Sequence, residues 1–291
     1  MRFNRFKAAL AVTGLAVSLA ACGDGDSGDH VDVDVKAADN LTGVPKELAD
    51  AGKITIGIKE DQPGIGYLAP GADSPSGIDI EMGRIIAAKL GISDDDIEWV
   101  ETVSDNREPF LQNGTVDLVL ASYSITDERR AVVGQAGPYY VTGQQLLVRE
   151  DDKDKITGPD DLKGIKVCSV EGSTSLERVE TEYGAKPVPF ATYSECVEQL
   201  ESETVDAVTT DGAILLGYAA EKPDELEVVG EPFSEERYGV GYKKDAEGMC
   251  DFLNETLQAS FDDGTWADAF ETTLGESGVE TPDPPTLDPC P

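Results

Sequence analysis

Few side chains in this sequence could act as a nucleophile, a general base or a metal ligand. The only histidine among the 291 residues is His30, which lies in a Gly-, Asp- and Ser-rich segment near the N-terminus. A Ser–His–Asp or Cys–His arrangement needs a histidine in the folded body, and so does a histidine-based metal site. The sequence therefore argues against hydrolases of these kinds, and no metal or other cofactor is expected.

The N-terminus has the build of a secretory signal peptide. Three basic residues within the first seven precede an apolar run over 8–21, which is too short to span a bilayer as a helix. The run ends in the letters LAAC at 19–22, which resemble the bacterial lipobox, where the cysteine becomes lipidated and N-terminal. We expect a signal peptide over 1–21 and lipidation of Cys22, the alternative being an ordinary signal peptide. The lipid alone would hold the protein at the extracellular face of the cell membrane.

Four cysteines follow Cys22, namely Cys168, Cys196, Cys250 and Cys290. No two of them have the CxxC spacing of a zinc site or of thioredoxin-type chemistry. In an exported protein an even number of cysteines indicates two disulfides, for which three pairings exist. We favour Cys168–Cys196 and Cys250–Cys290, because each of these bonds closes a local segment.

The segment after Cys22 is polar and acidic, and so is the chain as a whole. Residues 23–40 offer little apolar area to bury, which favours a flexible acidic tether over 22–43. The formal charge is −35, and removal of residues 1–21 takes away three positive charges to leave −38. A body of this charge is not expected to bind nucleic acid or an anionic membrane through its overall field.

Strand-like and helix-like segments alternate through the body. The letters KITIGIK at 53–59 alternate in polarity as in a strand, and 77–90 has apolar residues at helical spacing. The run VDLVLA at 116–121 is typical of a strand buried on both faces. The alternation predicts parallel sheets in an α/β class. A second round has expected strands at 164–170 and 205–209, and expected helices at 175–183, 194–202 and 213–220.

Polar side chains follow two similar strands. The letters TVDLV at 115–119 lead into Ser122 and Ser124, and TVDAV at 204–208 leads into Thr210 and Asp211. In open α/β sheets, ligands bind beyond the carboxyl ends of the strands. Two such sheets facing one another would place these polar residues across one cleft.

A longer set of motifs resembles a known family. The letters GIDIEMGRIIAAKL at 77–90 are similar to the signature of bacterial extracellular solute-binding proteins of the polar amino-acid class, the receptors of ABC importers. The letters NGTVD at 113–117, SYSITDER at 122–129 and GPYY at 137–140 add to this resemblance. It covers about residues 45–275, and it is strongest to the glutamate-binding lipoproteins of actinobacteria.

The resemblance implies a two-lobed periplasmic-binding-protein-like fold of type II in the α/β class, with two hinge strands. These should pass near 145–149 and 237–241. The first lobe would then combine 44–146 with 239–291, and the second would span 147–238.

Arg129 is a natural clamp for the α-carboxylate of an amino acid, because its planar guanidinium donates two parallel hydrogen bonds. It sits just inside a helix whose expected N-cap is Thr126. The resemblance places Ser124 on the same carboxylate and Ser122 nearby.

The second half of the body would supply the opposite wall. The resemblance places Ser173 and Thr174 on the ligand carboxylate, where they lead into a helix whose first backbone amides form an anion site. Asp211 would meet the α-ammonium group.

The resemblance also indicates which residues read the ligand side chain. Ser104 and Arg107 are similar to the pair that holds the distal carboxylate in glutamate/aspartate receptors. Lys59 falls near another arginine of those receptors, and Tyr193 falls near a histidine.

The resemblance thus implies a monomeric, non-enzymatic lipoprotein that binds glutamate or aspartate and delivers it to ABC permease and ATPase subunits. Three alternatives stay open. The ligand could be glutamine, asparagine or cystine. The fold could carry an enzyme similar to cyclohexadienyl dehydratases, with Glu171 as the acid in the cleft. The third alternative is a sensory lipoprotein that passes its ligand signal to a partner.

Overall fold

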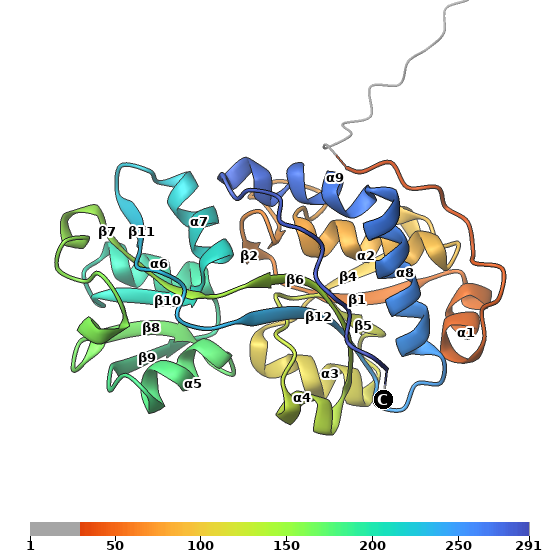
Figure 1. Cartoon of the computed structure of the whole chain (residues 1–291), viewed down its shortest axis with the longest axis horizontal. Coiled ribbons are helices and arrows are strands. Elements are labelled where there is room, and N and C mark those ends of the chain that lie inside the picture. The colour runs from red at the N-terminus through yellow and green to blue at the C-terminus, as the bar shows by residue number, and fades with distance from the viewer. Residues whose placement is uncertain (1–29, 291) are drawn as a thin grey trace, which may run out of the picture.

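The protein consists of two lobes that lie side by side and are joined by two strands (Figure 1). The structure is a computed structural model, and it describes residues 30–290. The signal peptide expected at 1–21, Cys22 and residues 22–29 of the expected tether lie outside the described residues. Within 30–290, no helix combines the length and apolar composition that a membrane span requires.

The first lobe is built on a five-stranded mixed sheet in the order β4-β1-β5-β12-β6. Strand β1 pairs in parallel with β4 and β5, whereas β12 is antiparallel to β5 and β6. The strands are β1 (Ile54–Ile58), β4 (Ile97–Glu101), β5 (Leu118–Val119), β6 (Gly134–Thr142) and β12 (Glu236–Tyr242), with a separate hairpin of β2 (Asp61–Gln62) and β3 (Gly66–Tyr67). The helices are α1 (Gly43–Ala51), α2 (Ile78–Lys89), α3 (Arg107–Asn113), α4 (Asp127–Val132), α8 (Met249–Asp263) and α9 (Thr265–Glu271).

The second lobe repeats this plan with the order β11-β7-β10-β8-β9. Its strands are β7 (Gln144–Arg149), β8 (Lys166–Val170), β9 (Lys186–Phe190), β10 (Ala207–Asp211) and β11 (Leu226–Val229), and its helices are α5 (Thr174–Thr181), α6 (Tyr193–Glu201) and α7 (Gly212–Glu221). Strands β8, β9 and β10 are parallel, and β7 is antiparallel to β10 and β11. The two-lobed α/β architecture is confirmed. The expected parallel pairing is present between β1, β4 and β5 and between β8, β9 and β10, whereas β6, β7, β11 and β12 pair antiparallel.

The chain crosses between the lobes at Thr142–Gln144 and again before Glu236. Thr142 and Glu236, the last residue of β6 and the first of β12, are paired neighbours at this point. Both crossings lie slightly before the expected 145–149 and 237–241, because Gln144 already pairs with Asp211 in the second sheet. The C-terminal helices α8 and α9 pack on α2 in the first lobe.

Residues 30–38 are bound to the first lobe. The Lys36 and Ala38 amides donate to the carbonyl oxygens of Ala88 and Lys89 at the end of α2, at 3.0 and 2.9 Å. His30, the first residue of this segment, places its Nδ1 atom 2.7 Å from the Glu81 carboxylate. The last carbonyl groups of a helix lack partners within the helix, and this segment supplies two of them. Residues 30–38 of the expected tether thus contact the first lobe.

Both favoured disulfides are present. Cys168 in β8 is bonded to Cys196 in α6, and Cys250 in α8 is bonded to Cys290 in the C-terminal tail. The first bond ties α6 to β8, an inner strand of the second sheet, and the second ties the tail to the first lobe.

Removing the first bond should destabilise the second lobe. We expect Cys168→Ala/Cys196→Ala to lower the free energy of unfolding by about 3 kcal/mol, because the bond closes a segment with a sequence separation of 28 and restricts the unfolded chain. Urea unfolding of wild type and variant measures this difference. An unchanged free energy of unfolding would contradict the prediction.

Candidate functional site

Nine of the ten residues expected to contact a ligand line one small cavity between the lobes. The wall also includes Thr210, which we expected in the cleft but not as a ligand contact, and two residues that we did not predict, Ser175 and Ile214. The nine are Ser104, Arg107, Ser122, Ser124 and Arg129 of the first lobe, and Ser173, Thr174, Tyr193 and Asp211 of the second.

The loop after β5 is held in shape by a buried carboxylate. Ser122 has a φ of +44°, a conformation that is uncommon for residues other than glycine. Its amide donates to Asp79 Oδ2 at 2.7 Å, and the Tyr139 hydroxyl donates to the other oxygen. Burial raises the pKa of Asp79 to about 6, although these hydrogen bonds act in the opposite direction. Sequence reasoning missed Asp79, which lies within the GIDIE letters of the family motif.

Arg129 spans the cleft. Thr126 caps α4 as predicted, and its hydroxyl accepts the Arg129 amide at 3.2 Å. The guanidinium donates to the carbonyl oxygen of Ser124 in the first lobe at 2.7 Å and to that of Gly172 in the second at 3.2 Å. Its Nε lies 3.3 Å from a Glu108 carboxylate oxygen. Arg129 is therefore held at the cavity by both lobes.

Arg107 is a buried cation that needs an anion. It is 3% exposed, and it donates to the carbonyl oxygens of Ser104 and Ala121 at 3.2 Å each. None of the ion pairs within residues 30–290 includes Arg107. Burial, and then the neighbouring Arg129, lower the pKa of Arg107 to about 10. Because a buried unpaired charge is costly, this end of the cavity favours an anionic group.

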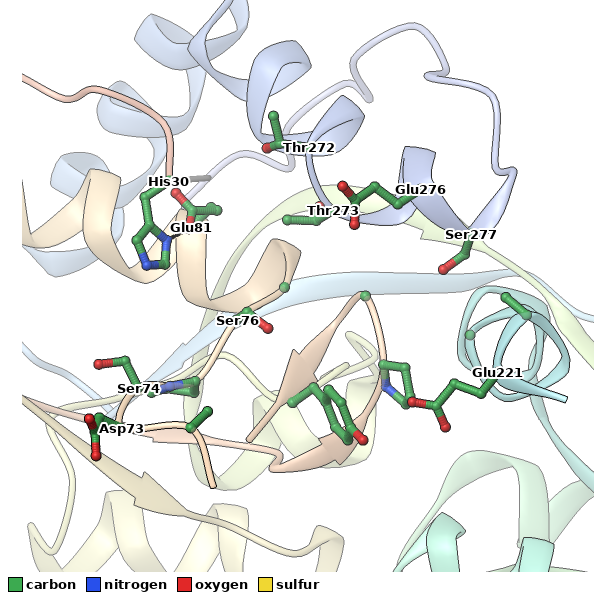
Figure 2. Close-up of a pocket in the computed structure, with 18 of the residues that line it drawn as sticks. His30, Asp73, Ser74, Ser76, Glu81, Glu221, Thr272, Thr273, Glu276 and Ser277 are labelled. Carbon is green, nitrogen blue, oxygen red and sulfur yellow. Dashed lines mark hydrogen bonds and ion pairs between the residues drawn. The ribbon is translucent and has the colours of Figure 1, made fainter. Parts of the chain in front are cut away.

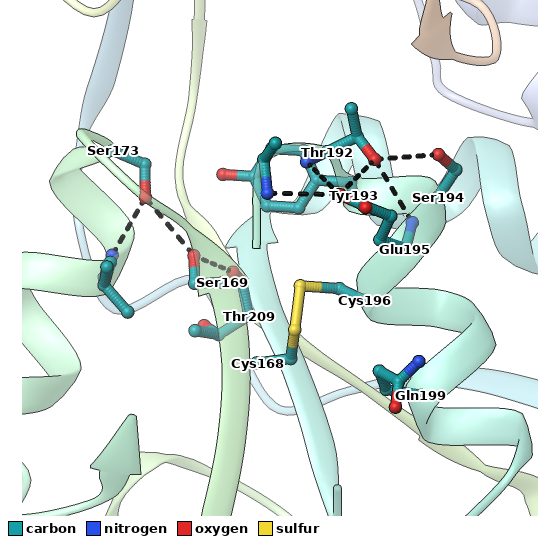
Figure 3. The surroundings of a disulfide bond; sticks show 12 residues. Cys168, Ser169, Ser173, Thr192, Tyr193, Ser194, Glu195, Cys196, Gln199 and Thr209 are labelled. Carbon is teal, nitrogen blue, oxygen red and sulfur yellow. Dashed lines mark hydrogen bonds between the residues drawn. A yellow bond between two sulfur atoms is a disulfide. The ribbon is translucent and has the colours of Figure 1, made fainter. Parts of the chain in front are cut away.

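The first residues of helices α5 and α6 form part of the cavity wall in the second lobe. Ser173 caps α5, with its hydroxyl accepting the Leu176 amide at 3.0 Å. Tyr193 is the first residue of α6, whose next turn carries the Cys168–Cys196 bond (Figure 3). The disulfide therefore fixes the helix that presents Tyr193 to the cavity.

Asp211 is a buried carboxylate with one free oxygen. Its Oδ2 accepts the Tyr238 hydroxyl at 2.7 Å, whereas its Oδ1 has no hydrogen-bond partner among the described residues. It occupies the N-cap position of α7 but makes no side-chain capping bond there. Burial, and then the nearby Glu236 charge, raise the pKa of Asp211 to about 7. A positively charged donor would satisfy the free oxygen.

Lys59 is the one expected residue that does not line the cavity. It is 1% exposed, and its Nζ lies 3.5 Å from Asp61 Oδ1, two residues along the same segment. Burial lowers the pKa of Lys59, and the Asp61 charge acts in the opposite direction. Lys59 is therefore the expected ligand residue for which the cavity lining gives no support, and Asp61 is its ion-pair partner.

The same Asp61 joins the two lobes on the side away from the crossing strands. Its Oδ2 accepts the amides of Tyr193 and Ser194 at the start of α6, at 2.7 and 3.3 Å. The Tyr218 hydroxyl of α7 donates to the Asp61 carbonyl oxygen. These contacts require the lobes to be closed on one another.

A larger cavity lies outside this closed cleft (Figure 2). Tyr67, Glu81, Glu221 and Glu276 are among its lining residues. None of the ten expected ligand residues lines it. The Glu81 carboxylate on its wall already forms a hydrogen bond with the His30 imidazole.

The comparison with known proteins agrees with this geometry. Residues 54–276 match the bacterial extracellular solute-binding proteins, family 3. The chain is 40% identical to the glutamate-binding protein GluB of Corynebacterium efficiens, over 94% of this chain and 92% of that protein. It is 32% identical to the ABC transporter glutamine-binding protein GlnH of Bacillus subtilis, over 94% of this chain and 98% of that protein. A solved structure of an ancestral arginine-binding protein bound to arginine is 34% identical, with a TM-score of 0.71, over 76% of this chain and 98% of that chain. The chain therefore belongs to family 3 of the bacterial extracellular solute-binding proteins.

Proposed function

We propose that this protein binds glutamate, or its shorter analogue aspartate, between its two lobes as the receptor of an ABC importer. The charge balance of the cavity carries the proposal. Two cations, Arg107 and Arg129, and one carboxylate, Asp211, line it. Glutamate has two carboxylates and one ammonium group, so each ligand charge would meet an opposite charge. The similarity to a protein named glutamate-binding supports the same ligand.

The arrangement suggests an orientation for the ligand. Arg129 and the backbone amides at the start of α5 would hold the α-carboxylate, with Ser173 and Thr174 at that helix start. Asp211 would receive the ammonium group with its free Oδ1. Arg107 and Ser104 would hold the distal carboxylate. Ser122, Ser124 and Tyr193 complete the wall.

A neutral side chain fits less well. Glutamine would bring an amide to Arg107 and leave the buried guanidinium without an opposite charge. Glutamine, asparagine and cystine are therefore alternatives that a ligand screen must include, since one relative is named as a glutamine-binding protein.

The dehydratase alternative depended on Glu171. This residue is exposed and does not line the cavity. The geometry thus gives that acid no position from which to act on a bound molecule.

Export and anchoring belong to the same proposal. Lipid on Cys22 would hold a monomeric receptor at the extracellular face of the cell membrane, next to permease and ATPase subunits. Labelling with a radioactive fatty acid should mark the wild type and leave Cys22→Ser unlabelled. Equal labelling of both would contradict the anchor.

A thermal-shift screen against the amino acids tests the ligand. Glutamate should raise the unfolding temperature most, because a ligand that binds only the folded form adds about 2.7 kcal/mol of stability at 100 times its Kd. Aspartate should follow, and glutamine should have a smaller effect at equal concentration. A larger shift with glutamine or cystine, or no shift with any amino acid, would contradict the proposal.

A further inference from the structure

A further carboxylate stands behind the cavity wall where the lobes join. Glu236 is the first residue of β12 and pairs with Thr142 at the crossing. It is 2% exposed, and it is not among the residues that line the cavity. Glu236 can therefore affect a ligand only through the groups that it binds or through its charge.

Glu236 accepts hydrogen bonds from three side chains. The Thr174 hydroxyl donates to Oε2 at 3.0 Å, and the Ser234 hydroxyl and an Arg178 N–H donate to Oε1 at 2.9 Å each. Burial acts to raise the pKa of Glu236, but hydrogen bonds, among them those from Arg178, Ser234 and Thr174, bring this pKa below its ordinary value. Glu236 is therefore ionised at neutral pH, with Arg178 as its ion-pair partner.

One of these partners, Thr174 of the second lobe, also lines the cavity. A hydroxyl group has one proton to donate. When that proton is directed to Glu236, the Thr174 oxygen can only accept from a ligand, so Thr174 would meet the α-carboxylate through its backbone amide and not through its hydroxyl.

We propose that Glu236 is a positioning residue for the bound amino acid. It holds the hydroxyl oxygen of Thr174 as an acceptor, and its negative charge behind the wall, with that of Asp211, favours an ammonium group at this end of the cavity. The inference rests on the proposed function only in requiring an amino-acid ligand, and it does not depend on which side chain that ligand has.

The electrostatics of Asp211 provide a separate test. Burial and then the Glu236 charge raise the pKa of Asp211, while Tyr238, Arg107 and Arg129 act to lower it. The pKa of Asp211 is raised to about 7. An ammonium group binds the ionised carboxylate, so ligand affinity should fall as the pH drops below about 7. The charged and titratable groups around Asp211 are Glu236 and Tyr238 of β12, Arg107 of α3, Arg129 of α4, Tyr140 of β6 and Tyr193 of α6.

The experiment is calorimetric titration of the purified full-length chain with glutamate between pH 5 and 8. Wild-type affinity should fall by about tenfold per unit below the Asp211 pKa. Glu236→Gln should weaken binding about tenfold at pH 8, and it should move the start of the fall about one unit lower, because a like charge is gone. Glu236→Asp keeps the charge and should retain the wild-type pH profile. Glu182→Gln is the matched control and should leave affinity and profile unchanged, since this glutamate lies 3.9 Å from Arg178 but is 60% exposed.

Two results for Glu236→Gln would overturn the inference. One is wild-type affinity with a wild-type pH profile, and the other is an equal loss at every pH, which a purely structural role would give. If Glu236→Gln does not fold, Glu236→Asp and Thr174→Val form a double-mutant cycle. Non-additive losses of affinity would support the inference, and additive losses would overturn it. If the wild type binds no amino acid, the proposed function and this inference are both overturned. The two Glu236→Gln results named above overturn the inference alone.

Discussion

Replacing Arg107 with methionine should lower glutamate affinity by about 100-fold and glutamine affinity by less than about tenfold. The guanidinium is buried at the cavity, and no carboxylate within residues 30–290 lies within ion-pair distance of it. Hydrogen bonds to charged groups contribute about 1.5–3 kcal/mol each, and the loss of two amounts to about 3 kcal/mol or more. Methionine keeps most of the apolar stem, so the packing under Tyr123, whose ring centroid lies 4.6 Å from the guanidinium carbon, changes little.

Calorimetry with both ligands measures the selectivity, and Arg129→Met is the matched comparison. Because Arg129 is expected to hold the α-carboxylate, which every amino acid has, its loss should weaken glutamate and glutamine binding alike. If Arg107→Met lost affinity for glutamate and for glutamine equally, Arg107 would not distinguish the ligand side chains. Glutamate specificity would then depend on other residues.

Gly217→Ala should weaken ligand binding by about 10- to 100-fold without destabilising the second lobe. Gly217 is buried in α7, and an added Cβ would lie 2.4 Å from the Pro63 carbonyl oxygen of the first lobe. Such overpacking costs about 1–3 kcal/mol. Here the two atoms belong to different lobes, so the clash is relieved when the lobes open. A ligand that binds the closed form must then work against this cost.

Helix propensity makes this prediction selective. Alanine is favoured over glycine inside a helix by about 1 kcal/mol, so the lobe itself should be at least as stable as in the wild type. Gly158→Ala is the control, because its backbone is extended and an added Cβ would meet no atom within 4 Å. The measurements are ligand affinity and the unfolding temperature without ligand. Unchanged affinity in Gly217→Ala would show that the contact with Pro63 is not needed for closure.

The sequence by itself determined the chemistry of the cavity walls. Polar residues after strands, such as Ser124 and Asp211, and helix starts, such as Ser173, are encoded within a few neighbouring residues. The order of family motifs along the chain then relates these short segments to one another. Periodicity and local spacing were enough for the α/β class and the two favoured disulfides, whereas the two lobes were implied by the family resemblance.

Tertiary structure decided what depends on partners distant in the chain. Asp79 supports Ser122 from 43 residues away, and Asp61 reaches Tyr193 from 132 residues away. Lys59 has the residue type of a ligand contact, but burial beside Asp61 removes it from the cavity. Glu236 looks like an ordinary acid in an acidic sequence, and only the crossing of the lobes places it behind Thr174. The physical reason is the same in each case, because the effect of a buried charge depends on its nearest partners, and these are brought together by folding.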